Sequence, residues 1–283
     1  MQGLRHATNR IYARWKNGKR TYVPYSWRWL NQFAGNLFWR NPGALIRPQY
    51  AWGIVFAAAL AKALGRKEVA VVEFGVAGGR GLLAMQNIAG EVSSAFDIEV
   101  RVYGFDTGVG LLHMPDARDL PQLYRPGDYR MDVDALRKRL APGTQLIIGD
   151  IKTTIDDFLS NPHPPVGFIS FDMDTYTATR DSLKLFRGDF ISQCLPRVVC
   201  YFDDIMGTTF GDLNGERLAM REYTLEHEPE RGISPVYGLR YHVGWPHSGA
   251  QWPDMMFWGH FMDHPDYCTF DGLGSAGGQA PIG

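Results

Sequence analysis

The feature that most limits the folds open to this chain is a series of short apolar runs, each ending at or beside a carboxylate. The runs are 69–74, 99–105, 145–148, 166–171 and 197–202. Longer stretches with helical spacing separate or flank them, at 51–64, 81–89, 133–140, 154–159, 178–186 and 215–228. Short buried strands that alternate with helices predict an α/β fold with a doubly wound, mostly parallel sheet.

The remainder of the 283 residues completes this arrangement. Tyr237–Val243 and Met255–Phe261 are expected to form an antiparallel pair at the edge of the sheet. We divide the chain into an N-terminal arm or cap (1–50), a ligand-binding α/β domain (51–271) and a flexible tail rich in glycine and small residues (272–283).

Charge is unevenly distributed along the chain. Residues 1–67 hold 12 of the 29 Lys and Arg residues, none of the 30 Asp and Glu residues, and five of the eight Trp residues. Because Trp is mostly buried, we favour a basic arm that packs over the acidic domain as a cap. The alternatives are contact with an anionic substrate, with a lipid headgroup surface or with a second copy of the chain. No motif that reads nucleic acid is present.

The remaining composition favours a cytoplasmic protein. The three cysteines, Cys194, Cys200 and Cys268, have neither disulfide-framework nor zinc-site spacing. No signal peptide is visible at the N-terminus. The apolar stretch Ile54–Leu64 is about half the length that a membrane-spanning helix needs, so we interpret it as a buried helix.

A glycine-rich loop follows the first apolar run. Its sequence is Glu73-Phe74-Gly75-Val76-Ala77-Gly78-Gly79-Arg80-Gly81. Glycines between a strand and a helix let the backbone approach a ligand closely. The spacing does not fit the G-x-G-x-x-G of dinucleotide-binding folds. The carboxylate of Glu73 would repel a pyrophosphate but attract an ammonium or sulfonium group, which favours S-adenosylmethionine as the ligand.

Two further strand ends offer partners for such a ligand. Asp106, followed by Thr107, ends the second run, where an acid accepts hydrogen bonds from ribose hydroxyls. Gly149 and Asp150 end the third run, where they would meet the adenine ring. Each acid taken singly fits a helix N-cap equally well.

Four aspartates follow the last two parallel runs. Asp172 and Asp174 come after 166–171, and Asp203 and Asp204 after 197–202. Carboxylates that meet at neighbouring strand ends repel each other unless a cation lies between them, and oxygen ligands suit Mg²⁺. The alternative is that they cap the following helices.

These motifs together resemble the macrocin O-methyltransferase family of class I S-adenosylmethionine-dependent enzymes. The resemblance covers roughly residues 50–225 and rests on Glu73–Gly79, Gly104–Thr107, Asp172-x-Asp174-x-Tyr176-x-x-Thr179 and Asp203-Asp204. It implies a Rossmann-like, seven-stranded methyltransferase sheet and Mg²⁺-assisted methylation of a hydroxyl. By this resemblance Glu73, Gly75 and Asp106 hold the cofactor, and Asp172, Asp203 and Asp204 hold the metal.

The resulting hypothesis is O-methylation of a small molecule, a sugar or an anionic metabolite. The expected cofactor residues are Glu73, Gly75, Val76, Ala77, Gly78, Gly79, Asp106, Thr107, Gly149, Asp150 and Asp172. Asp172 and Asp174 are the expected catalytic residues. A C-terminal histidine is the alternative base, from His242, His247, His260 or His264. Rival functions are a nucleotide-dependent dehydrogenase and a non-catalytic relative that acts through a protein partner. Homo-oligomerisation is a further expectation.

Overall fold

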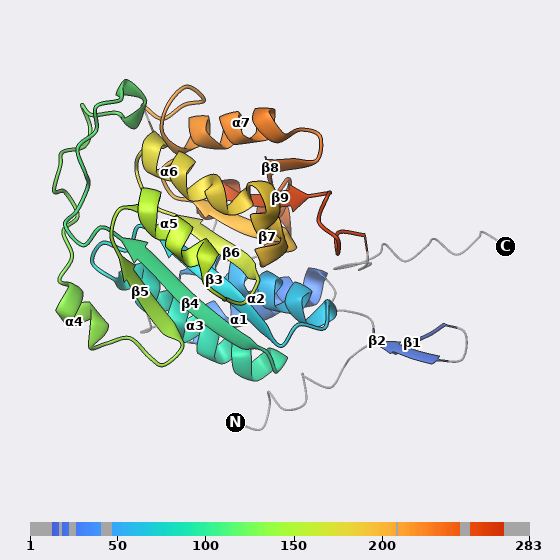
Figure 1. The fold of residues 1–283 in the computed structure, drawn as a ribbon. Coiled ribbons are helices and arrows are strands. Elements are labelled where there is room, and N and C mark those ends of the chain that lie inside the picture. The colour runs from blue at the N-terminus through green and yellow to red at the C-terminus, as the bar shows by residue number, and fades with distance from the viewer. Residues whose placement is uncertain are drawn as a thin grey trace.

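The computed structural model describes residues 13–16, 19–22, 27–40, 47–207, 209–243 and 250–268 (Figure 1). Within them, the main sheet contains β3 (Glu68–Phe74), β4 (Glu99–Asp106), β5 (Thr144–Ile148), β6 (Val166–Phe171), β7 (Cys194–Phe202), β8 (Arg231–Pro235) and β9 (Met256–Phe261). Their order across the sheet is β5-β4-β3-β6-β7-β9-β8. The strands from β5 to β7 are parallel, and β9 is antiparallel to both of its neighbours. The predicted seven-stranded, mostly parallel sheet is therefore confirmed.

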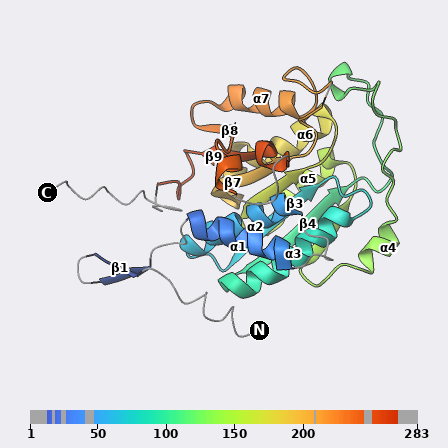
Figure 2. The ribbon, with the colours of Figure 1, turned by 180° about the vertical axis from the view of Figure 1, so that it is seen from behind.

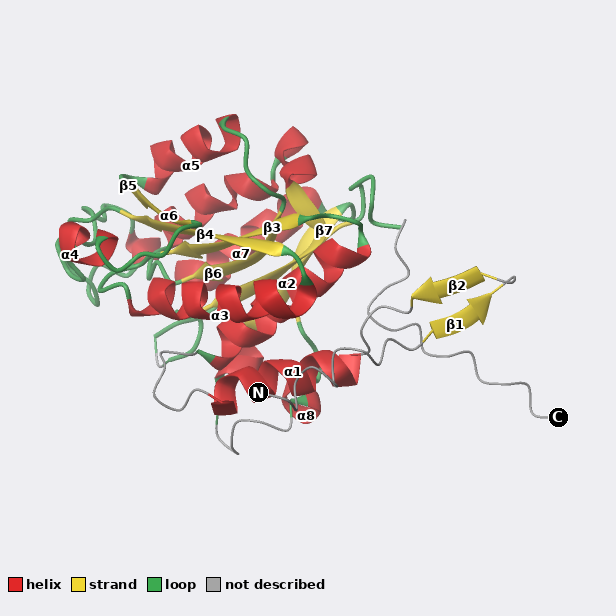
Figure 3. Cartoon of the chain, turned by 90° about the horizontal axis from the view of Figure 1, so that it is seen from below, coloured by secondary structure: helices red, strands yellow, loops and turns green. Residues whose placement is uncertain are grey.

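Helices cover both faces of this sheet. They are α1 (Trp27–Arg40), α2 (Pro48–Ala63), α3 (Arg80–Phe96), α4 (Val133–Arg137), α5 (Ile151–Ser160), α6 (Tyr176–Ser182), α7 (Gly215–His227) and α8 (Leu239–His242). Short 3₁₀ segments lie at Ala117–Asp119, Leu183–Phe186, Gly188–Gln193 and Trp252–Met255. Helices α2 and α3 lie on one face, with α5 on the other, as the view from below shows (Figure 3).

The core lies between α2 and the centre of the sheet. Strand β6 is buried at every position, and β3 at all but its first. Helix α2 is apolar all round, which suits a helix enclosed on all sides. It packs against β6 and β7 on one side and against α1 and α3 on the other. This helix corresponds to the buried helix expected at 51–64.

Part of the basic arm contributes to this core. Figure 2 shows α1 against α2 from behind the molecule. Leu30, Ala34 and Leu37 of α1 are buried. The Trp52 indole nitrogen donates a hydrogen bond to the Asn31 Oδ1 atom at 2.8 Å. Helix α1 thus packs against the core, while the two-stranded ribbon β1–β2 (Ala13–Lys16 and Lys19–Tyr22) forms a separate small sheet. The interpretation of the whole arm as a cap stays a prediction.

The boundaries of the arm and domain stay predictions. Helix α2, which belongs to the core, already begins at Pro48. The expected tail at 272–283 lies outside the described residues. Among the helices that the structure describes, none has the length and apolar character needed to cross a membrane.

The expected strand at Tyr237–Val243 is wrong. The partner of β9 is instead β8, Arg231–Pro235, and the segment that follows forms the short helix α8. Gly238, with φ of 76°, begins this helix, and Tyr237 and Tyr241 are 84 % and 88 % exposed. The aromatic spacing that suggests a strand therefore does not face the core.

Some helix bounds also differ from the sequence expectations. Helix α3 continues to Phe96 because Val92 and Phe96 extend its buried face. Helix α4 ends at Arg137 rather than 140. The helix expected over 178–186 begins at Tyr176, where the Thr175 hydroxyl caps it, and changes to a 3₁₀ turn after Ser182.

The close packing of α2 against β6 leads to a stability prediction. A methyl group added at Gly53 would lie 2.3 Å from the Phe168 ring. We expect Gly53→Ala to lower the free energy of unfolding by about 1–3 kcal/mol, the usual cost of overpacking a core. Chemical denaturation would measure this change.

Gly90→Ala is the matched control. Gly90 lies in α3, is exposed and has no heavy atom within 4 Å of an added Cβ. The same substitution should leave stability unchanged or raise it by up to about 1 kcal/mol, because alanine favours helix. Equal unfolding free energies for the two variants would contradict the packing described for α2.

Candidate functional site

A cavity of about 550 Å³ lies beyond the carboxyl ends of the parallel strands. It opens where the strand order reverses, between β3 and β6, the place where α/β sheets bind ligands. The predicted site residues that line it are Gly75, Ala77, Asp106, Thr107, Gly149, Asp150, Asp172, Asp174, Asp203 and Asp204. The structure thus brings together residues from five strand ends.

The glycine-rich loop forms one wall of the cavity. Gly75 adopts φ of 83°, and a Cβ there would lie 1.7 Å from the Asp172 carbonyl oxygen. Gly79 adopts φ of 80°, and a Cβ there would lie 2.4 Å from the Leu136 side chain. Both positions require glycine. Val76, Gly78 and Gly79 shape the loop without lining the cavity.

Asp106 holds this loop in place. One carboxylate oxygen accepts hydrogen bonds from the amides of Val76 and Ala77, at 2.9 and 2.8 Å. The other accepts from the Gly108 amide at 2.7 Å. An ionised carboxylate has about four acceptor positions, so about one remains for a ligand hydroxyl. Asp106 therefore both supports the loop and can meet a ribose.

Asp150 and Thr107 have structural bonds as well as a place in the cavity wall. The Asp150 carboxylate accepts a hydrogen bond from the Lys152 amide at 2.9 Å and caps α5. The Thr107 hydroxyl donates to the Gly110 carbonyl at 2.6 Å. The N-cap interpretation of Asp150 is confirmed, and its contact with adenine stays a prediction.

Glu73 lies beneath the loop and does not line the cavity. Its side chain is buried, and its Oε1 accepts a hydrogen bond of 2.6 Å from the Tyr50 hydroxyl. The Oε2 atom has no hydrogen-bond partner. Burial raises the pKa of Glu73 to about 8 despite that hydrogen bond, so the carboxyl is largely neutral near pH 7. The charge argument that Glu73 excludes a pyrophosphate therefore has no support from this geometry.

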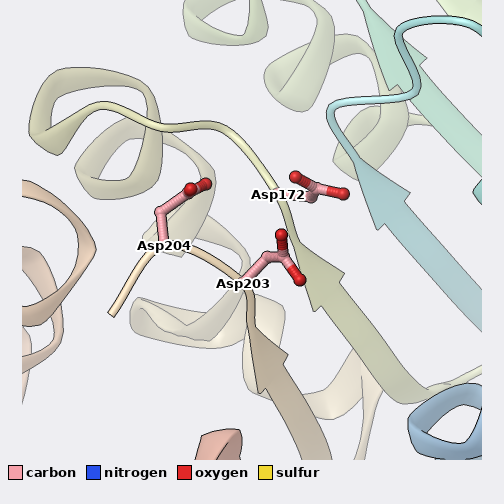
Figure 4. A group of neighbouring side chains, drawn as sticks. All are labelled: Asp172, Asp203 and Asp204. Carbon is pink, nitrogen blue, oxygen red and sulfur yellow. The ribbon is translucent and has the colours of Figure 1, made fainter. Parts of the chain in front are cut away.

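Three aspartates form a further part of the cavity wall. Asp172, at the end of β6, meets Asp203 and Asp204, at the end of β7 (Figure 4). One oxygen from each lies within 4.8 Å of the others. Burial, followed by the charges of Asp203 and Asp204, raises the pKa of Asp172 to about 7. Burial and the charges of Asp174 and Asp203 raise the pKa of Asp204 to about 7 as well.

Buried partners hold this cluster in shape. Glu216, on α7, accepts hydrogen bonds from the amides of Met173 and Asp204, at 3.3 and 3.1 Å. The Asp174 amide donates to the Asp204 Oδ2 atom at 3.0 Å, and Asp174 has φ of 61°. The Tyr201 hydroxyl donates to Asp203. The three aspartates are therefore positioned by the backbone and by buried groups, not merely gathered on the surface.

The donor set fits a hard divalent cation. Three carboxylates in mutual reach supply only oxygen ligands. Burial and then the neighbouring carboxylates raise the pKa of Asp172 and of Asp204, and a cation would relieve this repulsion. Mg²⁺ is usually held by one or a few carboxylates with water and substrate oxygens completing its shell. Asp172, Asp203 and Asp204 match that pattern.

The sequence interpretation missed several residues around the site. Arg47 and Tyr50 approach it from the start of α2, and Glu216 from α7. Glu216 carries a sequence signal, because it continues the buried stripe of Ala219, Met220 and Tyr223. Arg47 and Tyr50 carry none, since their partners lie far along the chain.

The cavity wall opposite the sheet comes from the segment after β4. Its lining residues there are Gly110, Leu111, Leu112, His113, Met114, Pro115, Asp116, Asp119 and Tyr129. The C-terminal histidines do not line the cavity where they are described. His264 contacts the Cys194 carbonyl and His260 the Tyr267 hydroxyl. His247 lies outside the described residues.

Comparison with known proteins identifies the fold. No protein-family model and no curated protein matches the chain. A crystal structure of CalS11, a calicheamicin methyltransferase, aligns with a TM-score of 0.50 and 19 % identity, covering 82 % of this chain and 91 % of that one. The chain therefore has the Rossmann-like methyltransferase fold.

Two further structures align less closely. The apo structure of CalS11, a TDP-rhamnose 3′-O-methyltransferase of calicheamicin biosynthesis, has a TM-score of 0.46 and 20 % identity, with coverage of 82 % and 91 %. A candidate S-adenosyl-L-methionine-dependent methyltransferase from Methanococcus maripaludis has a TM-score of 0.27 and 13 % identity, with coverage of 85 % and 94 %.

The raised pKa values predict how stability depends on pH and metal. The carboxyls of Asp172, Asp174 and Asp204 have a pKa of about 7 in the folded protein, against about 3.9 when unfolded. Between these values the folded protein holds more protons, so this contribution to stability is lost as pH rises through 7. Added Mg²⁺ should therefore raise Tm by about 3–6 °C at pH 8 and much less at pH 5.

Thermal unfolding of two matched variants tests the cause. Asp204→Asn should be more stable than wild type at pH 8 without metal and should lose the Mg²⁺-dependent rise. Asp150→Asn, in the same cavity but outside the cluster, should keep that rise. An equal Mg²⁺ effect in wild type and Asp204→Asn would show that the cluster is not the binding site.

Proposed function

We propose that this protein transfers the methyl group of S-adenosylmethionine to a hydroxyl of a small molecule, with Mg²⁺ held by Asp172, Asp203 and Asp204. The observation that carries the proposal is convergence. The glycine-rich loop, Asp106 and the three aspartates, which come from separate strand ends, line one cavity. Its volume of about 550 Å³ is within the usual range for small-molecule sites.

The loop side of the cavity suits the methyl donor. Gly75 and Ala77 bring backbone to the cavity surface, and Asp106 keeps an acceptor position for a ribose hydroxyl. Gly149 and Asp150 line the same side and are the proposed adenine contacts. Glu73 is not proposed as a direct ligand of the cofactor; it lies behind the loop and accepts a hydrogen bond from Tyr50.

The aspartate side suits the acceptor. When bound there, Mg²⁺ would supply Lewis-acid activation that lowers the pKa of the acceptor hydroxyl. Asp174 lines the cavity beside the cluster and is the proposed base. The methyl carbon–sulfur bond breaks as the carbon–oxygen bond forms, and the hydroxyl proton passes to the Asp174 carboxylate. Alignment of the two substrates can supply about 7–11 kcal/mol of the barrier reduction.

The acceptor class that we propose is a sugar or related polyol. The fold is that of CalS11, although the likeness itself extends only to the fold. Lys152 and Arg180 line the cavity and would tolerate an anionic substituent on the acceptor. The leucine and methionine side chains after β4 would contact its apolar surface.

Ligand binding separates this function from its rivals. We expect S-adenosylhomocysteine to bind in isothermal titration calorimetry and to raise Tm, and NAD and NADP to do neither, because the loop lacks the dinucleotide glycine spacing. If only NAD or NADP stabilises the protein, a nucleotide-dependent dehydrogenase becomes the better-supported function. Binding of S-adenosylhomocysteine without turnover of any sugar, polyol or catechol, with or without Mg²⁺, would favour the non-catalytic relative.

Substitution of the proposed base gives a sharper test. Asp174→Asn should lower the methyl-transfer rate about 10²–10⁴-fold, the usual contribution of a general base. Its affinity for S-adenosylhomocysteine should stay within about twofold of wild type, since the proposed cofactor contacts come from the ends of β3, β4 and β5.

His242→Gln serves as the control for the alternative base. His242 is an exposed residue of α8 and does not line the cavity, so turnover should be unchanged. A large loss of rate in His242→Gln, with Asp174→Asn close to wild type, would overturn the assignment of Asp174.

A further inference from the structure

The structure places one positive charge directly behind the aspartate cluster. The Arg47 Nη1 atom lies 3.5 Å from the Asp172 Oδ2 atom, and about a third of each side chain is exposed. Arg47 does not line the cavity, so it approaches Asp172 from outside it. Within the part of the chain that the structure describes, Arg47 is the one cationic side chain at ion-pair distance from a member of the cluster, and that member is Asp172.

Local sequence explains why Arg47 is held there. Pro48 is the first residue of α2, and a residue before proline adopts an extended backbone, as Arg47 does with φ of −92° and ψ of 124°. The Arg47 carbonyl accepts hydrogen bonds from the amides of Tyr50 and Ala51, at 3.1 and 3.0 Å. This backbone position directs the guanidinium toward the strand ends.

Tyr50 holds the same guanidinium group that pairs with Asp172. The Arg47 Nη1 atom donates to the Tyr50 hydroxyl at 3.1 Å, and its guanidinium carbon lies 5.2 Å from the centre of that ring. The Tyr50 hydroxyl in turn donates to Glu73 and accepts from Ser170 at 3.0 Å. Arg47 is therefore a half-buried side chain held by a network whose centre, Tyr50, is buried.

The charge of Arg47 changes the net charge at the aspartate cluster. Three ionised aspartates carry three negative charges, and Arg47 reduces the local sum to two, which one divalent ion neutralises. Burial acts to lower the pKa of Arg47, but interactions with Tyr50 and Glu73, and after them with Asp172 and Asp203, hold that pKa above its ordinary value. The guanidinium thus stays charged and interacts with two of the three aspartates.

We propose that Arg47 is a permanent counter-charge that sets the affinity of the aspartate cluster for Mg²⁺. This role rests on the metal-assisted part of the proposed function. Arg47 stabilises the cluster when no metal is bound, and the same charge repels a divalent ion and limits how tightly it binds. It is a positioning and tuning residue, because it contacts neither the cavity nor a reacting atom.

The test is metal affinity and stability of Arg47→Gln, with Mg²⁺ itself as the probe. Isothermal titration calorimetry at pH 8 should show Mg²⁺ bound about tenfold more tightly than in wild type, because a nearby unit charge is only partly screened. The metal-free variant should have a lower Tm than wild type. A residue with a purely structural role would not combine lower stability with tighter metal binding.

Two further variants isolate the charge. Arg47→Lys keeps a positive charge near Asp172. The affinity of this variant for Mg²⁺ should therefore lie within about twofold of that of wild type. Arg101→Gln is the matched control. Arg101 is similarly exposed, at 37 %, and pairs with Glu99 and Glu68 on the sheet, away from the cluster. It should lose some stability without a change in metal affinity.

The outcomes separate this proposal from the one it rests on. Unchanged or weaker Mg²⁺ binding in Arg47→Gln, with normal binding in wild type, would overturn the counter-charge role alone. If wild type binds Mg²⁺ no better than Asp204→Asn does, the metal-assisted mechanism is overturned together with this role. Binding of S-adenosylhomocysteine is measured separately and depends on neither result.

Discussion

The site depends on the close approach of two backbones at the centre of the sheet. Strands β3 and β6 are hydrogen-bonded neighbours, and the loop after β3 passes so near the end of β6 that Gly75 has no room for a side chain. The Asp172 amide donates to the Phe74 carbonyl at 2.9 Å. This contact joins the loop proposed to hold the methyl donor to the first of the aspartates proposed to hold the metal. A side chain at Gly75 would force the two halves of the site apart.

A second constraint is electrostatic. Parallel strands deliver their carboxyl ends to one edge, so the acids that end them meet there whether or not a ligand is present. The chain manages this repulsion in three ways: partly protonated carboxyls, hydrogen bonds from backbone amides and the Tyr201 hydroxyl, and the charge of Arg47. Each leaves the cavity side of the cluster open to a cation.

Much of the fold could be predicted from the sequence because its signals are local. Buried strands such as 166–171 and the glycine-rich turn are visible within a few residues, and the parallel topology follows from their alternation with helices. The convergence of Asp106, Asp172 and Asp203 follows from that topology. The strand β8 could not be predicted in this way, since it is short and polar. The alternating large residues of Tyr237–Val243 gave a stronger strand pattern, but the structure forms α8 there, with Tyr237 and Tyr241 exposed and Leu239 and Val243 buried.

The rest of the site could not be predicted because its contacts are distant in sequence. Tyr50 lies 23 residues from Glu73 and 120 from Ser170, and no local pattern marks it as a partner of either. Glu73 shows the opposite difficulty. Its position in the motif suggested a charged ligand of the cofactor, whereas burial makes it a largely neutral group beneath the loop. Local sequence identifies which residues are present at a strand end, but burial decides their charge and direction.

The position of β9 has a consequence for how the chain is made. Of the strands that the structure describes, β9 comes last in sequence, yet it lies between β7 and β8. During synthesis, β8 therefore has no neighbour in the sheet until Met256–Phe261 has left the ribosome, and the edge of β7 stays uncovered for the same period. A chain stopped before Met256 would expose two strand edges at once, which are templates for aggregation. The sheet can therefore be completed only after β9 has been made, because β9 supplies the partner for both β7 and β8.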